Sequence, residues 1–175
     1  MIIRPAKVSD AKGLATVGVR TWQSNYRGIF PDKELDLLSI EEYTERWKNA
    51  LKRSIPTENL DIIVAEDPRN GVVGFVSGGK YETTHPNYDC EIGAIYVLKN
   101  YQGKGIGTKM VEKMVDLFIS KGWKSMIIWV LKDNFQRGFY EKLGGISKET
   151  KIYDKWNKKY DLVGYVWEDI KEILK

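Results

Sequence analysis

A glycine-rich turn in mid-chain constrains the fold more than any other part of the sequence. It contains three glycines, follows a strand and precedes an amphipathic helix. The strand covers residues 90–97, and the turn reads Gln102-Gly103-Lys104-Gly105-Ile106-Gly107-Thr108. Helix N-termini expose unpaired N–H groups and a partial positive charge, and glycines let that backbone approach an anion closely. The segment therefore predicts a cradle for a phosphate or pyrophosphate group.

Two common phosphate-binding motifs do not fit this turn. A P-loop needs Lys and then Ser or Thr after its second glycine, but Thr108 follows Gly107 and no glycine stands at position 102. A dinucleotide fingerprint that starts at Gly105 fails at its last position, which is Met110. A nucleotide-binding loop of another kind, or a turn that only joins strand to helix, stays open from these residues alone.

The rest of the chain alternates between strand and helix periodicities. We expect strands at residues 2–4, 61–66, 72–77, 90–97, 125–131, 146–153 and 160–167. We expect four helices. The first starts near residue 10, the second follows the capping box at residues 39–42, the third follows the glycine-rich turn and ends near residue 122, and the fourth covers residues 135–143. This order predicts one α+β (mixed α/β) domain over residues 1–175.

Composition and charge exclude several classes of protein. The net charge of +4 comes without a basic run, so nucleic acid is not an expected partner. The single cysteine, Cys90, and the single histidine, His85, argue against a disulfide scaffold and against a Cys/His metal site, so no metal is expected. The sequence shows no secretory signal and no membrane-spanning stretch. We therefore expect a cytoplasmic location and no association with a membrane.

Two motifs resemble the GNAT N-acetyltransferase superfamily. The run 102–107 has the Gln-x-x-Gly-x-Gly form of the family's acetyl-CoA pyrophosphate loop. In residues 129–144, a strand leads to Asn134 and then to Phe-Tyr-Glu-x-Leu-Gly, which looks like the second family signature. Residues 3–6 and Asp10 are similar to the family's first strand and helix start. The resemblance covers nearly the whole chain.

Two glycines depart from the family pattern. Gly138 falls inside the expected helix over 135–143, where glycine costs about 1 kcal/mol relative to alanine. Gly145 stands where many members carry an aromatic residue. Neither position carries the chemistry that the resemblance implies.

The resemblance implies a GNAT-like acyl-CoA N-acyltransferase fold, with a mostly antiparallel mixed sheet flanked by helices. The strands at 91–97 and 125–131 would splay apart, and pantetheine of acetyl-CoA would lie between them. The implied cofactor-binding residues are Ile95, Tyr96, Val97, Gln102, Gly103, Lys104, Gly105, Ile106, Gly107, Thr108 and Asn134.

The implied activity is acetyl transfer to a primary amine by direct attack within a ternary complex. Such an amine holds its proton at pH 7, so a base must remove it, and Glu91 is the candidate. Tyr140 is the candidate acid for the leaving thiolate, and the Val97 N–H could stabilise the oxyanion. Counting in twos puts Glu91 on the same strand face as Ile95 and Val97.

Each of these residues also has a structural interpretation. Glu91 could be a solvated or ion-paired strand carboxylate, and Tyr140 could be a buried aromatic beside Phe139. If both lack a chemical role, the chain would be a non-catalytic acyl-CoA-binding regulatory module on the same fold.

The acceptor cannot be read from the sequence. Trp22 and Tyr26 lie in the region that lines the acceptor pocket in this family, so we expect them to contact a small amine or peptide amine. A polyamine, an amino acid, an antibiotic amine and a protein N-terminus stay open. Exposed aromatics at Tyr153, Trp156 and Tyr160 could pair C-terminal strands in a homodimer.

Overall fold

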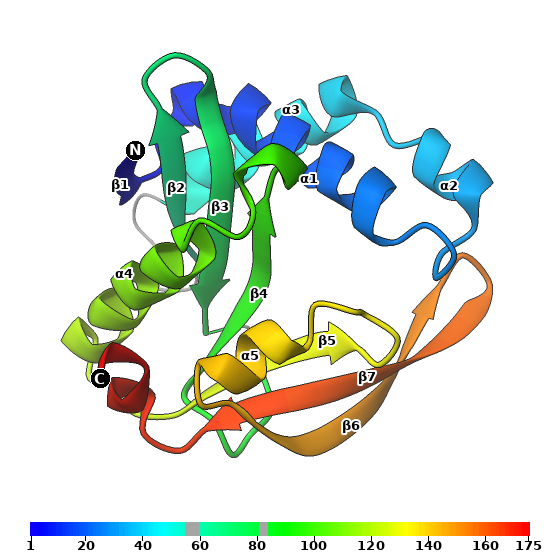
Figure 1. The fold of residues 1–175 in the computed structure, drawn as a ribbon. Helices are drawn as coiled ribbons and strands as arrows, with labels where there is room; N and C mark the ends of the chain where they lie inside the picture. The colour runs from blue at the N-terminus through cyan, green and yellow to red at the C-terminus, as the bar shows by residue number, and fades with distance from the viewer. Residues whose placement is uncertain (55–59, 81–83) are drawn as a thin grey trace.

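The computed structural model describes residues 1–54, 60–80 and 84–175. One seven-stranded sheet, of order β1-β2-β3-β4-β5-β7-β6, runs through it (Figure 1). Among the described strands, only β4 and β5 run parallel, so the sheet is mixed and mostly antiparallel, which confirms the predicted fold class. The strands are β1 (Ile2–Pro5), β2 (Asp61–Asp67), β3 (Gly71–Gly79), β4 (Cys90–Val97), β5 (Met126–Leu131), β6 (Ile146–Lys155) and β7 (Lys158–Trp167).

Helices cover both faces of the sheet. The helices are α1 (Ala11–Asn25), α2 (Asp32–Asp36), α3 (Ile40–Ser54), α4 (Ile106–Ser120) and α5 (Gly138–Lys142), with short 3-10 turns η1 (Val8–Asp10), η2 (Lys99–Tyr101) and η3 (Ile170–Leu174). α1 and α3 pack together on one face, and α4 lies on the other (Figure 1). None of the helices in the described ranges combines the length and apolar character that a membrane crossing requires.

Apolar stripes along the helices hold them to the sheet. On the α4 face, Met110, Met114 and Phe118 are fully buried against the sheet. On the other face, Leu14 and Val17 of α1 are equally buried. Each such side chain contributes about 1.5–3 kcal/mol by leaving water, so packing rather than helix propensity fixes these elements.

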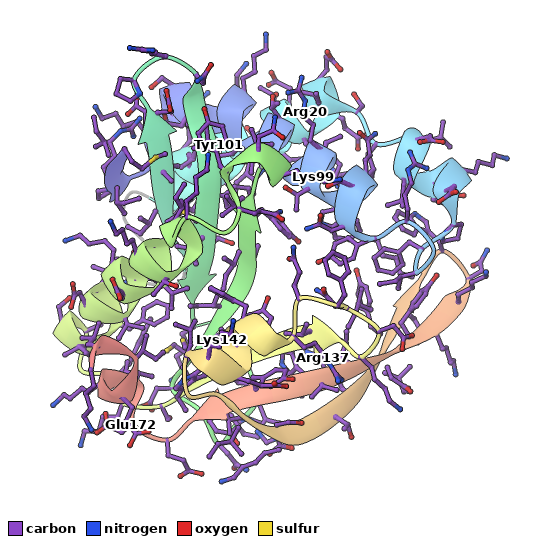
Figure 2. All side chains as sticks on the ribbon, viewed as in Figure 1. Arg20, Lys99, Tyr101, Arg137, Lys142 and Glu172 are labelled. Carbon is purple, nitrogen blue, oxygen red and sulfur yellow. The ribbon has the colours of Figure 1, made fainter. Side chains whose placement is uncertain are left out.

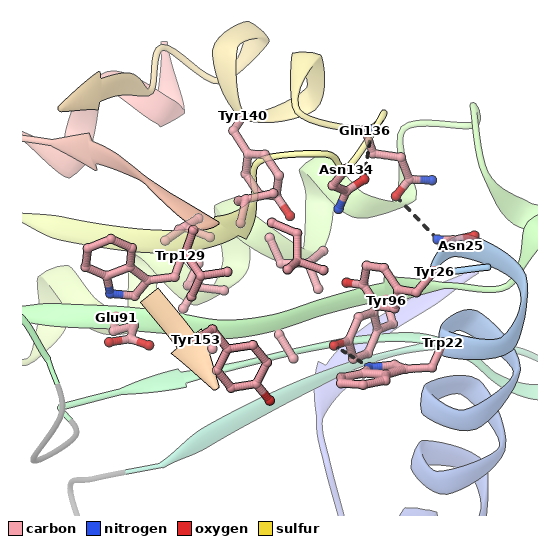
Figure 3. A pocket seen from close by; sticks show the side chains of 18 of the residues that line it. Trp22, Asn25, Tyr26, Glu91, Tyr96, Trp129, Asn134, Gln136, Tyr140 and Tyr153 are labelled. Carbon is pink, nitrogen blue, oxygen red and sulfur yellow. Dashed lines mark hydrogen bonds between the residues drawn. The ribbon is translucent and has the colours of Figure 1, made fainter. Parts of the chain in front are cut away.

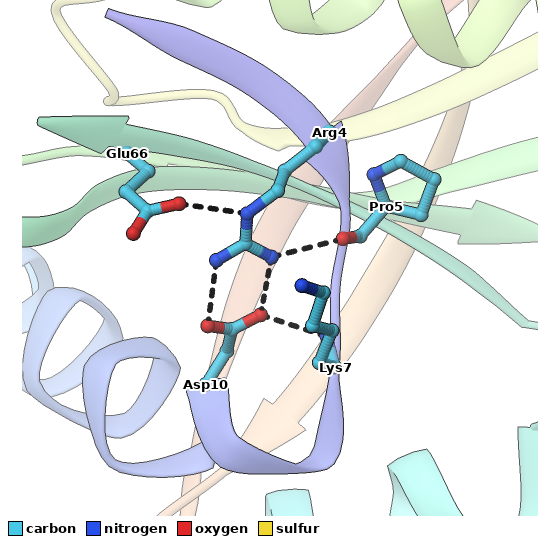
Figure 4. A network of polar contacts seen from close by, with 5 residues as sticks. All are labelled: Arg4, Pro5, Lys7, Asp10 and Glu66. Carbon is cyan, nitrogen blue, oxygen red and sulfur yellow. Dashed lines mark hydrogen bonds and ion pairs between the residues drawn. The ribbon is translucent and has the colours of Figure 1, made fainter. Parts of the chain in front are cut away.

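An ion-pair network ties the first strand to the first helix (Figure 4). The Arg4 guanidinium donates to both carboxylate oxygens of Asp10, at 2.7 and 2.9 Å, and to Glu66 of β2 at 2.7 Å. Asp10 also accepts the Lys7 N–H at 2.7 Å. These bonds keep the pKa of the buried Asp10 carboxyl below its usual value, with the Arg4 bond as the largest cause. Arg4 therefore fixes where α1 begins.

Helix α5 is shorter than the sequence predicted. It starts at Gly138 instead of residue 135, because the Asn134 side-chain oxygen accepts the Gln136 N–H at 2.9 Å and holds the chain in a turn. Phe135 in this turn is 74% exposed. The expectation that Gly138 lies in mid-helix is therefore wrong, and the cost of an interior glycine does not arise.

A β-bulge in β4 changes the face on which Glu91 lies. The β3–β4 register steps from Ser77↔Ala94 to Gly78↔Ile92, which leaves Gly93 without a partner. Glu91 therefore shares its face with Ala94 and Tyr96 instead of Ile95 and Val97. The prediction that Glu91 shares a face with Ile95 and Val97 is therefore wrong, because the extra residue in the bulge reverses the alternation of side chains between the two faces of the strand.

The aromatic side chains expected to be exposed at the C-terminal strands are packed instead. Tyr153, Trp156 and Tyr160 are half-buried around Phe30, from the segment between α1 and α2. Phe30 lies edge-on to Trp156 at 5.3 Å and to Tyr160 at 4.8 Å. The β6–β7 hairpin thus packs against the end of α1, and the expectation that these aromatics are exposed is wrong.

Candidate active site

The predicted splay between β4 and β5 is present. The two strands pair only through Cys90↔Met126, Glu91↔Ile127 and Ile92↔Ile128, and then diverge (Figure 1). The Leu98 N–H donates to the Val73 carbonyl on the β3 side at 2.9 Å. Because backbone groups alternate sides along a strand, the N–H and C=O groups of Ile95 and Val97 face the gap. The Ile95 backbone groups and the Val97 N–H are therefore available along one wall of the gap, whereas the Val97 carbonyl already accepts the Gln102 side-chain amide.

The glycine-rich turn forms an open cradle at the end of this gap. Gly103 and Gly105 both have φ of +73°, and an added Cβ at either would meet no atom within 4 Å. The first N–H that bonds back at the start of α4 is that of Lys109, to the Gly105 carbonyl at 3.1 Å. The N–H groups of residues 106–108 before it therefore have no helical acceptor. An anion can approach them without displacing a side chain.

A groove of about 550 Å³ runs past this cradle. The predicted cofactor residues that line it are Ile95, Val97, Gln102, Gly103, Gly105, Ile106, Gly107 and Thr108. The remaining three lie elsewhere. Lys104 points away and donates to the Asn100 carbonyl at 3.0 Å, whereas Tyr96 and Asn134 line a second cavity. The Gln102 N–H is already bonded to the Lys99 carbonyl at 3.2 Å.

Basic side chains flank the groove from both sides. Figure 2 shows Arg20 and Lys99 on one side of it and Arg137 and Lys142 on the other. Lys142 is part of the groove wall. The sequence did not reveal this arrangement, because these residues are far apart along the chain and form no basic run. Their positive charge favours an anionic ligand in the groove.

A chain of side-chain amides crosses between the groove and the second cavity. The Asn25 amide donates to Gln136 at 3.4 Å, Gln136 donates to Gln102 at 3.3 Å, and Gln102 donates to the Val97 carbonyl at 2.8 Å. Sequence reasoning missed Asn25 and Gln136, since nothing local marks two amides that meet only after folding. The two cavities share Asn25, Ile95, Gln136 and Tyr140 as lining residues. They are therefore adjoining compartments.

The second cavity, of about 280 Å³, has seven aromatic residues in its walls (Figure 3). The predicted acceptor residues Trp22 and Tyr26 both line it. The Trp22 indole N–H donates to the Tyr96 hydroxyl at 2.8 Å, and its ring stacks on Phe30 at 5.3 Å. Tyr153 of β6 forms part of the opposite wall. We call this the acceptor cavity.

Tyr140 stands where the groove and the acceptor cavity meet. Its ring points into the acceptor cavity (Figure 3) and stacks on Tyr165 at 5.5 Å. Burial raises the pKa of the Tyr140 hydroxyl, and the nearby Tyr96 and Tyr165 hydroxyls raise it further. The phenol therefore keeps its proton at neutral pH and can donate it.

Glu91 lies in the wall of the acceptor cavity and is only 9% exposed. Its Oε2 atom has no hydrogen-bond partner. Burial raises the pKa of the Glu91 carboxyl, and the positive charge of Lys151 lowers it in part. The structure thus contradicts the interpretation of Glu91 as a solvated strand carboxylate and leaves it able to accept a proton.

Neither of the other reactive side chains adjoins this site. Cys90 is fully buried, and burial raises the pKa of its thiol, so it packs as a small apolar residue. His85 lies 3.8 Å from the Glu149 carboxylate and lines neither cavity. Within residues 1–54, 60–80 and 84–175, no three His, Cys, Asp or Glu side chains are grouped as a metal site would need.

Comparisons with known proteins agree with this geometry. Residues 19–145 match the model of the Acetyltransferase (GNAT) family. YuaI of Bacillus subtilis, described as an uncharacterized N-acetyltransferase, is 30% identical over 168 residues, which cover 96% of this chain and 93% of that protein.

Two solved structures share the fold. PaiA N-acetyltransferase from Thermoplasma acidophilum, in complex with coenzyme A, superposes with a TM-score of 0.70 at 20% identity, over 93% of this chain and 96% of that one. The yncA protein of Salmonella typhimurium, solved with its cofactor acetyl-CoA, gives a TM-score of 0.70 at 19% identity, over 97% and 94%. With the family match over residues 19–145, these findings show that the chain belongs to the acetyltransferase (GNAT) family.

Proposed function

We propose that this protein transfers an acetyl group from acetyl-CoA to a primary amine, by direct attack of the amine within a ternary complex. One observation carries the proposal: a groove with an anion cradle and a cavity with an unpaired carboxylate meet at the half-buried Tyr140. A single ligand site would need only one of these compartments. Two adjoining compartments favour two substrates that react where they meet.

The residues along the groove fit acetyl-CoA. The open positions at Gly103 and Gly105, and the N–H groups of residues 103–108, would hold the pyrophosphate. The backbone of Ile95 and Val97 would pair with the pantetheine amides, and Asn134 would bind the cofactor arm. When bound, acetyl-CoA supplies a thioester whose acetyl group can move to nitrogen and whose sulfur leaves as a thiolate.

Glu91 would take the proton that the amine must lose. A free amine with a pKa near 10 is almost fully protonated at pH 7, a penalty of about 4 kcal/mol that a positioned base offsets. Tyr140 would give its proton to the departing sulfur, since burial keeps that hydroxyl protonated. The Val97 N–H would donate to the carbonyl oxygen as negative charge develops there. The C–N bond forms as the C–S bond breaks. The nitrogen loses two protons in all, one to Glu91 before the attack and one that restores the Tyr140 phenol after it has protonated the sulfur, and Glu91 then releases its proton to water.

Release of the free CoA thiol tests the proposal. Tyr140→Phe should lower kcat by about 100-fold or more, because the acid is lost, while coenzyme A affinity stays close to that of the wild type. Tyr165→Phe is the matched control, since Tyr165 stacks on Tyr140 but lines neither cavity. Unchanged turnover in Tyr140→Phe would remove the acid role. Tight acetyl-CoA binding without acetylation of any amine would instead indicate the non-catalytic module.

A further inference from the structure

Two side chains of opposite charge line the acceptor cavity without pairing with each other. Glu91, from β4, leaves its Oε2 atom without a partner. Lys151, from β6, places its ammonium group 4.1 Å from the centre of the Trp129 ring. In the described part of the chain, neither forms an ion pair, and they are the only charged residues among those that line this cavity.

Strand pairing explains why Lys151 faces inward. Along β6, Glu149, Lys151, Tyr153 and Lys155 are half-buried, and the residues between them are exposed. Lys151 pairs with Leu162 of β7, which also lines the cavity. The position of this lysine is therefore set by the hairpin and does not depend on a flexible loop.

Both charges are desolvated without full compensation. Burial lowers the pKa of the Lys151 ammonium group and raises the pKa of the Glu91 carboxyl, and each is opposed only by the field of the other. A buried charge without an ion-pair partner is costly, and the contact with the Trp129 ring offsets only part of that cost for the half-buried Lys151. A ligand that brings a positive and a negative group to this cavity would satisfy both side chains at once.

Resting on the proposed function, we infer that the acceptor is an amino acid, with its ammonium group at Glu91 and its carboxylate at Lys151. The cavity of about 280 Å³ suits a small ligand, and its aromatic walls suit an apolar side chain. Lys155 adds positive charge close by, over the rings of Trp22 and Trp156 at 5.2 and 4.5 Å. This charge disfavours a polyamine, whose further ammonium groups would be repelled.

Matched pairs of amines test the inference. Leucine and 3-methylbutylamine, or phenylalanine and phenethylamine, differ only in the carboxylate. In the CoA-release assay, kcat/KM of the wild type should be at least about tenfold higher for the amino acid of each pair. Lys151→Met keeps the length of the side chain and removes the charge, and it should reduce this preference about ten- to a hundredfold, mainly through KM.

Lys148→Met is the matched control on the same strand. Lys148 is exposed, pairs with Glu168 and does not line the cavity, so its removal should leave the preference unchanged. Equal use of both amines of each pair by the wild type, or an unchanged preference in Lys151→Met, would overturn the inference and leave acetyl transfer intact.

Direct binding separates this inference from the proposed reaction. Trp22 and Trp129 line the cavity, so amino acid binding should change tryptophan fluorescence. If leucine binds the wild type but not Lys151→Met, and no amine is acetylated, the reaction fails while the assignment of the site holds. If leucine neither binds nor reacts while another amine is acetylated, only the inference fails.

Discussion

Glu91 is a strand carboxylate that folding has placed in an unfavourable environment. It is 9% exposed, one of its oxygens has no partner, and burial raises its pKa. The bulge at Gly93 turns it toward the acceptor cavity. A cost of this kind is typical of groups retained for chemistry.

At the residue scale, Glu91→Gln should be more stable and less active than the wild type. Because the Glu91 pKa is higher in the folded state, the folded protein binds more protons than the unfolded chain at any pH between the two pKa values. Stability of the wild type therefore falls as the pH rises through that window. The variant should gain about 1–3 kcal/mol at pH 7, a gain that disappears below about pH 4, and should lose about 100-fold or more in kcat. Denaturant titrations at both pH values and the CoA-release assay measure this. A variant that is less stable at pH 7 would instead mark Glu91 as structural.

At the element scale, the loop before α4 should need Gly105 for ligand binding as well as for stability. Gly105→Ala introduces a side chain at a φ of +73°, which costs about 1–2 kcal/mol, and puts a methyl group into the open cradle. Gly122→Ala, at a φ of +83° just after α4, introduces the same kind of strain at the opposite end of that helix from the cradle. Both should lose similar stability, but only Gly105→Ala should weaken coenzyme A binding, by about tenfold or more. Equal affinity in calorimetry would show that the anion binds elsewhere.

The junction of β1 and α1 depends on a single guanidinium group. Arg4→Met would leave the buried Asp10 carboxylate without its main partner, at a cost of about 3–5 kcal/mol. Because the Asp10 pKa is lowered, its stabilising effect is present above about pH 4 and is lost as pH falls through the folded value. Arg4→Met should therefore flatten the acid limb of the stability curve. Arg4→Met with Asp10→Asn should recover part of the loss, and a double variant as unstable as the single one would contradict this account.

At the scale of the whole molecule, the sheet has two parts joined at one end. β1–β4 and β5-β7-β6 are joined by three residue pairs between β4 and β5 and then separate around the groove. A ligand in the gap contacts both parts, so coenzyme A at a hundred times its Kd should stabilise the protein by about 2.7 kcal/mol. For a chain of this size, that raises Tm by about 5–10 °C, measurable by calorimetry. Hydrogen exchange should slow in β4 and β5, and slowing confined to α4 would contradict a ligand that bridges the parts.

Most of the fold could be predicted because its signals are local. Alternating and helical periodicities placed the strands and the long helices, and the run 102–108 placed the anion cradle. The helix over 135–143 was predicted too long, because the turn that delays it depends on the Asn134 side chain. Tyr140 and Glu91 could be proposed from the motifs, but their roles stay predictions until they are tested.

The sequence by itself determined the order of the elements, the glycine turn and the family, since each is encoded within a few consecutive residues. Only the tertiary structure decided that the Gly93 bulge turns Glu91 toward the acceptor cavity, that Lys151 lines the same cavity, and that Gln136 bridges to Gln102. The physical reason is that register and packing between distant segments depend on the whole core. One inserted residue reverses the face on which a side chain lies. No local pattern indicates that Glu91 and Lys151, sixty residues apart in the sequence, line one cavity.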